Sequence, residues 1–302
     1  MTSINTAAIA NTPHWSLTIG VFDSGVGGLT VLAPLMAQFP DARFVYVADN
    51  AYMPYGEQSP AVLLERLTQL LPWLAKQCDV IALACNTAAS LMIEHGLMAG
   101  WSALNQVPII DPIQPVCEQL ANDGNLAHPT IVILATPKTT AMGVYPRVLQ
   151  ELNPALDVRS VSGQQLAGYF EHGHPDPAAY ETLLDTVAAE IQTHLSPNTS
   201  ASLVLGCTHY PHMRAALAAR LPNTVTMLDP AEAMVTKLTQ VVEGLASASM
   251  VENQDAVKKP SVAGFWVTGD PERFKTVAQQ CSGLVIPGVQ SWQPKDLCVE
   301  AV

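Results

Sequence analysis

The sequence predicts an α/β protein in which two similar domains, each a doubly wound parallel sheet, are related by pseudo-two-fold symmetry. Three observations lead to this fold class. Short β-branched runs alternate with longer helical segments, which is typical of strand–helix–strand units. The pattern repeats approximately in the second half of the chain. The 302 residues are also enough for two domains of roughly 150 residues each.

The predicted strands and helices follow one another along the whole chain. Strands are expected at 16–22, 43–48, 80–84, 130–135, 157–162, 201–206, 223–229, 263–269 and 283–287. Helices are expected at 27–39, 60–78 and 177–195, after Asn86, and from Pro230 and Pro271. Four helices begin with a proline that suits the first turn, preceded by a side chain that can cap free backbone N–H groups: Ser59, Asp176, Asp229 and Asp270. Pro72 predicts a kink, and the polar stretch 249–261 predicts a loop.

The internal repeat centres on two cysteines that each follow an apolar strand. In IALACNTAAS (81–90) and LVLGCTHYPH (203–212), the strand leads to a small residue, a Cys and then a Thr within two residues. Because open α/β sheets bind ligands beyond the carboxyl ends of their strands, each half would present one thiol at such an edge. A chance likeness between ordinary strand–turn–helix units is the alternative explanation.

Composition excludes several classes of protein. Hydrophobic residues make up 49% of the chain and charged residues 13%, so it can bury a large core and is not intrinsically disordered. The net charge of −12 argues against nucleic acid or an anionic membrane surface as the main partner. Residues 1–16 contain no Lys or Arg, so we expect a loose extension rather than a signal peptide. Six unclustered cysteines predict a reduced, cytoplasmic protein without a disulfide framework.

Cys85 and Cys207 differ from the other four cysteines, which are expected to be buried packing residues: Cys78, Cys117, Cys281 and Cys298. Both lie where a strand ends and a helix begins, and backbone N–H groups there favour a thiolate. Two facing thiols suit inversion at a carbon that bears an acidic hydrogen. One thiolate removes the proton from one face, and the other thiol returns a proton to the opposite face.

The glycine-rich stretch DSGVGG (23–28) has two interpretations. In a dinucleotide-binding loop, Asp49 at the end of the second strand would be the acid that binds the ribose. However, Thr30 replaces the third glycine of that fingerprint. The interpretation that we prefer is a tight loop that holds a small ligand with its amides and the hydroxyl of Ser24. Asp23 would then face an ammonium group or a thiol.

Three further motifs have weaker functional interpretations. YMPYG (52–56) is typical of a turn. Cys207, His209 and His212 have the spacing of metal ligands, and His172 and His174 could be added, yet this local set supplies three ligands at most. His209 more plausibly tunes Cys207. Lys138 follows a strand, but nothing around it indicates pyridoxal phosphate, so we expect a loop lysine.

Four segments together carry a family resemblance: FDSGVGGLTVL, ADNAYMPYGEQS, LACNTAAS and LGCTHYPHM. In this order they resemble glutamate racemase, a cofactor-independent enzyme of the aspartate/glutamate racemase superfamily, over most of 18–245 and the later TGDPERF segment. The resemblance implies that Cys85 deprotonates the D enantiomer with help from Asp23, and that Cys207 deprotonates the L enantiomer with help from His209. It implies no metal and these substrate-binding residues: Asp23, Ser24, Pro54, Tyr55, Gly56, Asn86, Thr87, Thr208 and His209.

The same resemblance implies a domain organisation and a cellular role. The first domain would be discontinuous, at 17–112 and 225–302, with a second domain at 113–224 and the active site in the cleft between them. A homodimer is common in such proteins, and the D-glutamate formed would supply peptidoglycan synthesis. Some relatives bind DNA gyrase, and extended relatives suggest that residues 1–16 carry regulation by a cell-wall precursor, although this arm has no recognisable phosphate site.

The chain departs from the family pattern at three places. Met142 stands where a serine usually follows the Thr136–Thr139 loop, and Pro230 follows Asp229 where a serine is common. Glu171 matches a glutamate near the second thiol, but the Cys-Pro run that usually precedes it is missing. Glu171 and Thr139 are therefore weaker candidates.

Two other enzyme activities stay open. An aspartate racemase would share the fold, although His209 after the second Cys-Thr favours glutamate, because aspartate racemases usually have an acid there. A thiol hydrolase would use Cys207 and His209 and would need only one cysteine.

Overall fold

The computed structural model describes residues 17–122, 130–163, 165–171, 176–197, 199–249, 264–284, 286 and 288–293. The expected N-terminal extension and nearly all of the loop expected at 249–261 lie outside the described residues. Within the described parts of the chain, no helix is both long and apolar enough to cross a membrane.

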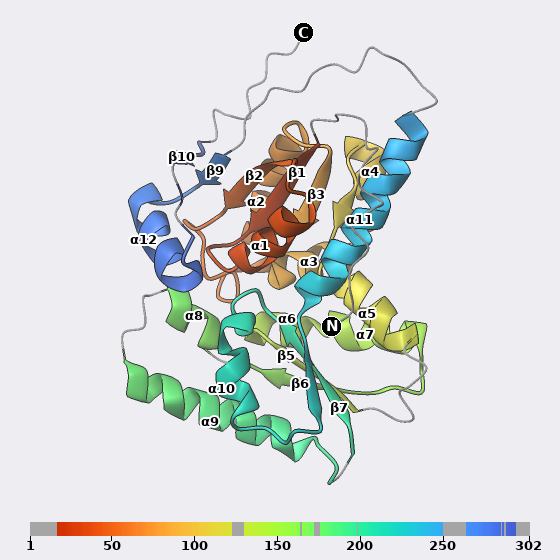
Figure 1. Cartoon of the computed structure of the whole chain (residues 1–302), viewed down its shortest axis with the longest axis vertical. Coiled ribbons are helices and arrows are strands. Elements are labelled where there is room, and N and C mark those ends of the chain that lie inside the picture. Colours follow the sequence, from red (N-terminus) through yellow and green to blue (C-terminus); the bar gives the residue numbers. More distant parts are fainter. Residues whose placement is uncertain are drawn as a thin grey trace.

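The strands form two parallel sheets, which lie one above the other in Figure 1. The first sheet has the order β10-β9-β2-β1-β3-β4, and the second has the order β6-β5-β7-β8. The first consists of β1 (Thr18–Asp23), β2 (Arg43–Ala48), β3 (Val80–Leu83), β4 (Ile109–Ile110), β9 (Gly264–Val267) and β10 (Val289–Ser291). The second consists of β5 (Thr130–Ala135), β6 (Asp157–Ser162), β7 (Ala201–Gly206) and β8 (Val225–Leu228). Because the order β2-β1-β3-β4 recurs as β6-β5-β7-β8, the predicted fold class and internal repeat are confirmed.

Helices connect the strands and cover the sheets. Those that precede β5 are α1 (Leu29–Gln38), α2 (Pro60–Ala75), α3 (Asn86–Glu94), α4 (Leu97–Asn105) and α5 (Ile113–Asn122). Those that follow it up to β8 are α6 (Pro137–Met142), α7 (Val144–Leu152), α8 (Leu166–Glu171), α9 (Pro177–Thr193), η2 (Tyr210–Met213) and α10 (Arg214–Ala218). The last two are α11 (Pro230–Ser249) and α12 (Pro271–Ser282). Helix α11 returns from the second sheet and packs against α1 and α5.

The four predicted helix caps are confirmed. Ser59 Oγ accepts a hydrogen bond from the Val62 N–H, and the carboxylates of Asp176, Asp229 and Asp270 accept from amides in the first turn of the helices that follow them. Each cap satisfies a backbone donor that the helix itself leaves free. Pro72 lies inside α2, which ends at Ala75, short of the expected residue 78.

The strand predicted at 283–287 is wrong. Gly283 has a φ of 68° and closes α12 with its N–H on Gln279 O, and the pairing strand follows later as β10. The apolar side chains of Leu284 and Ile286 pack against the core around the first sheet, so their hydrophobicity serves packing rather than a strand.

The predicted return to the first domain at residue 225 comes too early. Strand β8 begins at Val225 and pairs with β7, so it belongs to the second sheet. The chain rejoins the first sheet only afterwards, through α11 and β9. Beyond this strand, the division of the chain at 112 and 224 stays a prediction.

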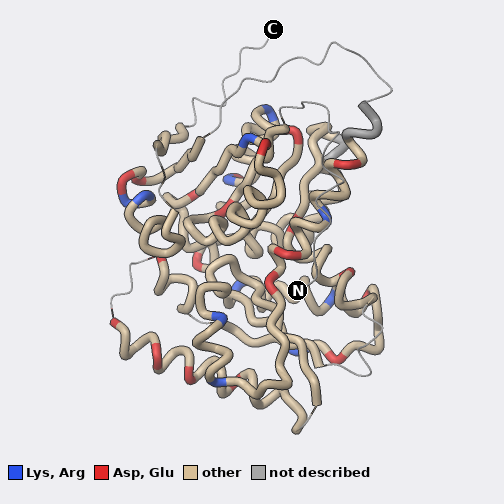
Figure 2. Tube along the Cα trace, viewed as in Figure 1, with Lys and Arg blue, Asp and Glu red and all other residues tan. Residues whose placement is uncertain are grey.

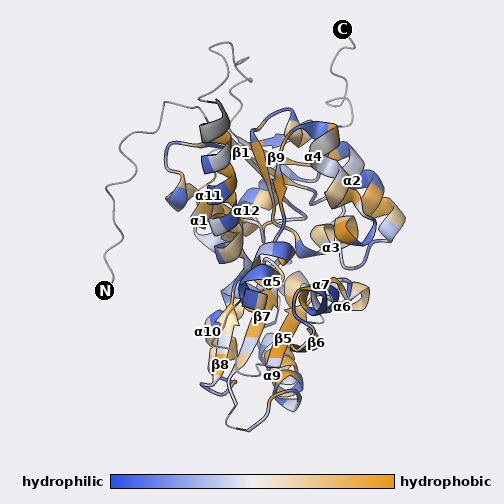
Figure 3. Cartoon of the chain, turned by 90° about the vertical axis from the view of Figure 1, so that its right-hand side faces the viewer, coloured by the Kyte–Doolittle hydropathy of each residue, from blue (hydrophilic) through white to orange (hydrophobic). Residues whose placement is uncertain are grey.

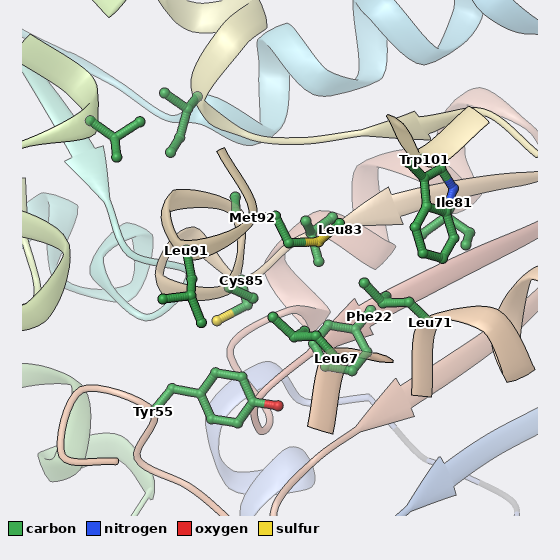
Figure 4. Packing of buried hydrophobic residues seen from close by; sticks show 14 of the residues in the cluster. Phe22, Tyr55, Leu67, Leu71, Ile81, Leu83, Cys85, Leu91, Met92 and Trp101 are labelled. Carbon is green, nitrogen blue, oxygen red and sulfur yellow. The ribbon is translucent and has the colours of Figure 1, made fainter. Parts of the chain in front are cut away.

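The central strands carry the core. Strands β1, β3, β5 and β7 are buried along their whole length, as parallel strands are when helices cover both faces. Figure 3 shows this as hydrophobic colour along the strands, whereas Figure 2 shows charged residues mainly on outer helices such as α9. One apolar cluster joins Phe22, Leu67 and Leu83, and it includes Tyr55 and Cys85 (Figure 4). The hydrophobic core therefore extends up to one of the two thiols.

Candidate active site

One cavity lies at the carboxyl ends of the central strands of both sheets. The chain reaches it where β1 leads to Ser24, β3 to Cys85, β5 to Thr136 and β7 to Cys207. Its lining consists of Ser24, Met53, Pro54, Tyr55, Gly56, Cys85, Asn86, Thr87, Thr136, Ala167, Glu171, Cys207, Thr208 and His209. The two cysteines singled out by the repeat thus face a single cavity from different sheets.

Each cysteine is placed by the turn that follows its strand. Cys85 is the residue before α3, and its carbonyl accepts the N–H of Ala89 at 2.9 Å. Cys207 follows β7 directly, and its carbonyl accepts the N–H of Tyr210 at the start of η2. Both side chains are buried, yet both touch the cavity. The predicted strand-to-helix position is confirmed, with a short 3-10 helix after the second cysteine.

The thiol of Cys85 is held in its protonated form. Burial raises its pKa to about 12, and the negative charge of Asp23 acts in the same direction. The Sγ–H donates a long hydrogen bond of 3.7 Å to Ser24 Oγ. In the free protein, Cys85 is therefore a protonated thiol that can donate a proton to the substrate.

Asp23 lies behind the cavity wall and is completely buried. Its carboxylate accepts the N–H of Gly25 at 3.0 Å and the hydroxyl of Thr208 at 3.3 Å. Burial raises the pKa of Asp23 to about 6, although the charge of His209 partly offsets this rise. A carboxyl group with this pKa can accept or release a proton near neutral pH.

Cys207 has a different set of partners. Its sulfur lies 3.7 Å from His209 Nδ1, and His209 Nε2 lies 2.7 Å from Glu171 Oε1. Burial lowers the pKa of His209, but Glu171 and the contact with Cys207 outweigh it, so the pKa is well above its ordinary value. The imidazolium then donates to Glu171 at one end and to the sulfur of Cys207 at the other.

Hydroxyl and amide groups lie beside the first thiol. Thr87 Oγ1 lies 3.2 Å from Thr136 Oγ1 and 3.1 Å from Thr139 Oγ1. Tyr145 donates its hydroxyl to Asn86 Oδ1 at 2.6 Å. Thr87 and Asn86 also open α3, whose free N–H groups favour anions. This side of the cavity can therefore bind a carboxylate.

Hydrogen bonds around the cavity join the two halves of the chain. Glu171 accepts the N–H of Val26 at 3.0 Å, and Thr208 O accepts the hydroxyl of Thr30 at the same distance. The Thr208–Asp23 and Tyr145–Asn86 bonds also cross from one half to the other. The halves are thus held together by hydrogen bonds at and directly behind the wall of the cavity.

Nearly all predicted substrate-binding residues line the cavity, and Asp23 is the exception because it lies behind the wall. Four lining residues are additional: Met53, Thr136, Ala167 and Glu171. Glu171 was only a weak candidate, yet it holds the imidazole of His209. Thr136 opens the Thr136–Thr139 loop, which the resemblance had already indicated, and Met53 directly precedes Pro54. No sequence signal pointed to Ala167.

The other motifs do not form the sites that their spacing suggested. The carboxylate of Asp49 binds Arg66, Tyr55 and Thr268, which leaves it no room for a ribose hydroxyl. His212 lies with its ring 5.3 Å from that of Phe170, and His172 and His174 lie outside the described residues. Among the residues that the structure describes, no three His, Cys, Asp or Glu side chains form a group that could hold a metal ion.

Gly27 leaves room for the second catalytic group. A Cβ atom at this position would collide with Thr208 Oγ1 and lie 2.7 Å from the ring of His209. We expect Gly27→Ala to displace His209 and lower kcat/KM by about tenfold, since small misplacements of reacting groups are costly. Steady-state kinetics check this, with Gly244→Ala as control because its Cβ would meet nothing within 4 Å. Equal activities of the two variants would contradict the steric argument.

Comparisons with known proteins agree with this geometry. The family model for Asp/Glu/Hydantoin racemase matches residues 31–238. A glutamate racemase from Microcystis aeruginosa is 30% identical over 266 residues, which cover 88% of this chain and 87% of that protein.

Two solved structures give the same result. A glutamate racemase isoform from Bacillus anthracis superimposes with a TM-score of 0.75 at 26% identity, covering 93% of this chain and 98% of that one. The glutamate racemase from Francisella tularensis, solved in complex with D-glutamate, also has a TM-score of 0.75, at 25% identity, covering 92% and 98%. The chain therefore belongs to the Asp/Glu/hydantoin racemase family, and the relatives that it resembles there are glutamate racemases.

Proposed function

We propose that this protein interconverts L-glutamate and D-glutamate without a cofactor, by a two-thiol acid/base mechanism. The observation that carries the proposal is the pair Cys85 and Cys207, which line one cavity from different sheets. Each thiol has its own polar partners, Ser24 and Asp23 for the first and His209 for the second. The relatives named glutamate racemase support glutamate as the substrate.

For L-glutamate, the cycle starts with Cys207 as the thiolate and Cys85 as the thiol. The thiolate of Cys207 removes the Cα proton and becomes a thiol, and the electron pair stays on the flattened carbanion. The thiol of Cys85 then gives its proton to the opposite face, which yields D-glutamate and a thiolate at Cys85. His209 lies beside the sulfur of Cys207 at the start, and Glu171 holds the imidazole in place.

For D-glutamate, the roles reverse, and Cys85 must begin as the thiolate. Asp23 accepts the proton of the Cys85 thiol, and Cys207 becomes a thiol with the proton of the His209 imidazolium. The thiolate of Cys85 then removes the Cα proton of D-glutamate, and the thiol of Cys207 gives its proton to the opposite face, which yields L-glutamate and a thiolate at Cys207. Ser24 Oγ lies within hydrogen-bonding distance of Cys85 Sγ and stabilises the thiolate. The hydroxyl groups around Thr87 and the amides that open α3 bind a carboxylate of the substrate.

Circular dichroism of L-glutamate incubated with the purified protein and no additives tests the proposal. We expect the signal to decay to zero as the racemic mixture forms, and a Cys85→Ala variant to leave it unchanged. A signal that persists with the wild-type protein would contradict the proposed function. Parallel incubations in heavy water, followed by NMR at Cα of glutamate and of aspartate, separate the two substrates. Exchange confined to aspartate would favour an aspartate racemase.

A thiol hydrolase is the second candidate, and one observation favours it. Cys207, His209 and Glu171 form a nucleophile–base–acid series with contacts of 3.7 and 2.7 Å. Such an enzyme predicts a burst of product from an activated ester, and it predicts that Cys85→Ser leaves turnover intact. Loss of ester turnover in Cys85→Ser would exclude the thiol hydrolase.

Several finer features belong to the proposal as well. We propose that the enzyme acts in the cytoplasm, forms a homodimer and supplies D-glutamate for peptidoglycan, because these properties accompany the family resemblance. Light scattering tests the dimer. Binding to DNA gyrase is a weaker expectation, supported only by the net charge of −12, and a pull-down with purified gyrase tests it.

A further inference from the structure

A buried ion pair lies next to the cavity but does not line it. The carboxylate of Asp49 is completely buried and accepts four hydrogen bonds. Two come from the guanidinium of Arg66, from Nε to Oδ2 at 3.1 Å and from Nη2 to Oδ1 at 3.0 Å. The others come from Tyr55 OH at 2.7 Å and from Thr268 Oγ1 at 2.7 Å. All lone pairs of the carboxylate are therefore used.

The guanidinium of Arg66 is fixed from every side. Nη1 donates to Gln69 Oε1 at 3.1 Å, and the ring of Tyr52 lies 4.4 Å from the guanidinium carbon. The ring of Trp292 lies 5.4 Å from the same atom. Lysine cannot reproduce a planar guanidinium that makes two hydrogen bonds to one carboxylate and contacts two aromatic rings.

Tyr55 connects this ion pair to the reaction. Its ring is 2% exposed, belongs to the apolar cluster of Cys85 and lines the cavity. Burial and then the charge of Asp49 raise its pKa well above the ordinary value, so its hydroxyl stays protonated and donates. The backbone gives a second connection, because the N–H of Asp49 donates to Asp23 O at 3.0 Å. The Asp49 carbonyl also accepts the N–H of Tyr52, where the loop 52–56 begins.

We propose that Asp49 and Arg66 are positioning residues for the reaction: they hold Tyr55, and with it the loop 52–56, against the substrate. The inference rests on the proposed function, because it assigns the ion pair a role in substrate binding at that site. The pair touches no reacting atom and acts through Tyr55. Burial alone does not assign the pair a role, because a buried ion pair is weak evidence of stabilisation.

A structural role and a positioning role predict different kinetics. If the pair only stabilises the fold, Arg66→Lys lowers the unfolding temperature and leaves KM for glutamate unchanged. If it positions Tyr55, the same variant raises KM by about tenfold, because the bidentate bond to Asp49 is lost and the carboxylate that accepts the Tyr55 hydroxyl is no longer held in place. Tyr55→Phe keeps the ring and the ion pair, removes only the hydroxyl, and is expected to raise KM by about the same factor.

The experiment is a double-mutant cycle on KM and kcat for both enantiomers, well below the unfolding temperature of each variant. Both variants break the same connection between Arg66, Asp49 and Tyr55. Arg66→Lys in a Tyr55→Phe background should therefore raise KM by less than about a further twofold. Arg220→Lys is the matched control, since Arg220 is likewise ion-paired, in its case with Glu181 and Asp185, but lies away from the cavity. It should leave KM unchanged.

Two results would overturn the inference. One is a KM within twofold of the wild type for both single variants, whatever happens to their unfolding temperatures. The other is a double variant whose KM is the product of the two single effects. If Arg66→Lys fails to fold, Tyr55→Phe alone still decides, because an unchanged KM rejects the role. A wild-type protein without racemase activity would instead reject the proposed function, so the two failures are distinguishable.

Discussion

Cys85→Ser and Cys207→Ser are each expected to lower kcat/KM for racemisation by about a thousandfold, within the range of general acid–base catalysis. A serine hydroxyl has nearly the size of the thiol but is a far weaker acid, so it neither gives up a proton readily nor forms the anion that would accept one. The geometry therefore survives and the proton transfer does not. The two enantiomers have equal free energies in water. Each variant must therefore lose the same factor in both directions.

Exchange in heavy water separates the two thiols. We expect Cys85→Ser to retain exchange of the Cα proton of L-glutamate without inversion, because Cys207 still works on that face. Cys207→Ser should do the same with D-glutamate. Cys281→Ser is the control, since this half-buried thiol contacts Phe170 O and does not line the cavity. Racemisation by Cys85→Ser at more than a tenth of the wild-type rate would contradict the two-thiol mechanism.

Asp23→Asn is expected to lower kcat/KM by about a hundredfold, because an amide cannot accept the proton of Cys85. The pH profile gives the sharper test. Since the pKa of Asp23 is about 6, wild-type activity should fall as the pH drops through 6 and the carboxylate becomes protonated. His209 does not cause this fall, because its pKa lies well above 6.5. The variant should show no decrease there, and a decrease near pH 6 in both proteins would assign it to another group.

Asp23 also makes folding stability depend on pH. Its pKa is 3.8 in the unfolded chain and about 6 in the folded protein, so between these values the folded state binds more protons. The free energy of unfolding should then fall by about 3 kcal/mol as the pH rises through this window. Urea unfolding at pH 4 and pH 7, with Asp23→Asn as the reference, measures the difference. A wild-type protein that loses no more stability than the variant would contradict the raised pKa.

Local features of the fold could be predicted from the sequence, whereas distant contacts could not. The four caps were predictable because each capping side chain bonds to an amide two or three residues away. The two thiols were predictable because a repeated strand-and-turn pattern precedes both. Glu171 is different, since it is 38 residues from His209 and 145 from Val26, and only the tertiary fold brings the three together.

Distant contacts also explain why the strand expected at 283–287 is wrong. An apolar run such as Leu284 to Ile286 satisfies the pattern of a buried strand and equally that of a segment packed on a core. The left-handed conformation of Gly283 and the pairing of Val289 with Phe265 decide between them, and neither is encoded in hydrophobicity. Likewise, nothing in the sequence distinguishes Arg66 from other helix arginines, because only the fold brings Asp49 opposite it.

The segment that carries β9 and Thr268 is made after the entire second sheet, yet it docks at the outer edge of β2 beside Asp49. During synthesis on the ribosome, the second sheet can therefore be completed while the first still lacks one wall. A nascent chain that has passed Cys207 already contains both thiols, Asp49 and Arg66, but it lacks Thr268 and Trp292, which complete the surroundings of that ion pair. The surroundings of this buried ion pair are consequently completed as one of the last events of translation.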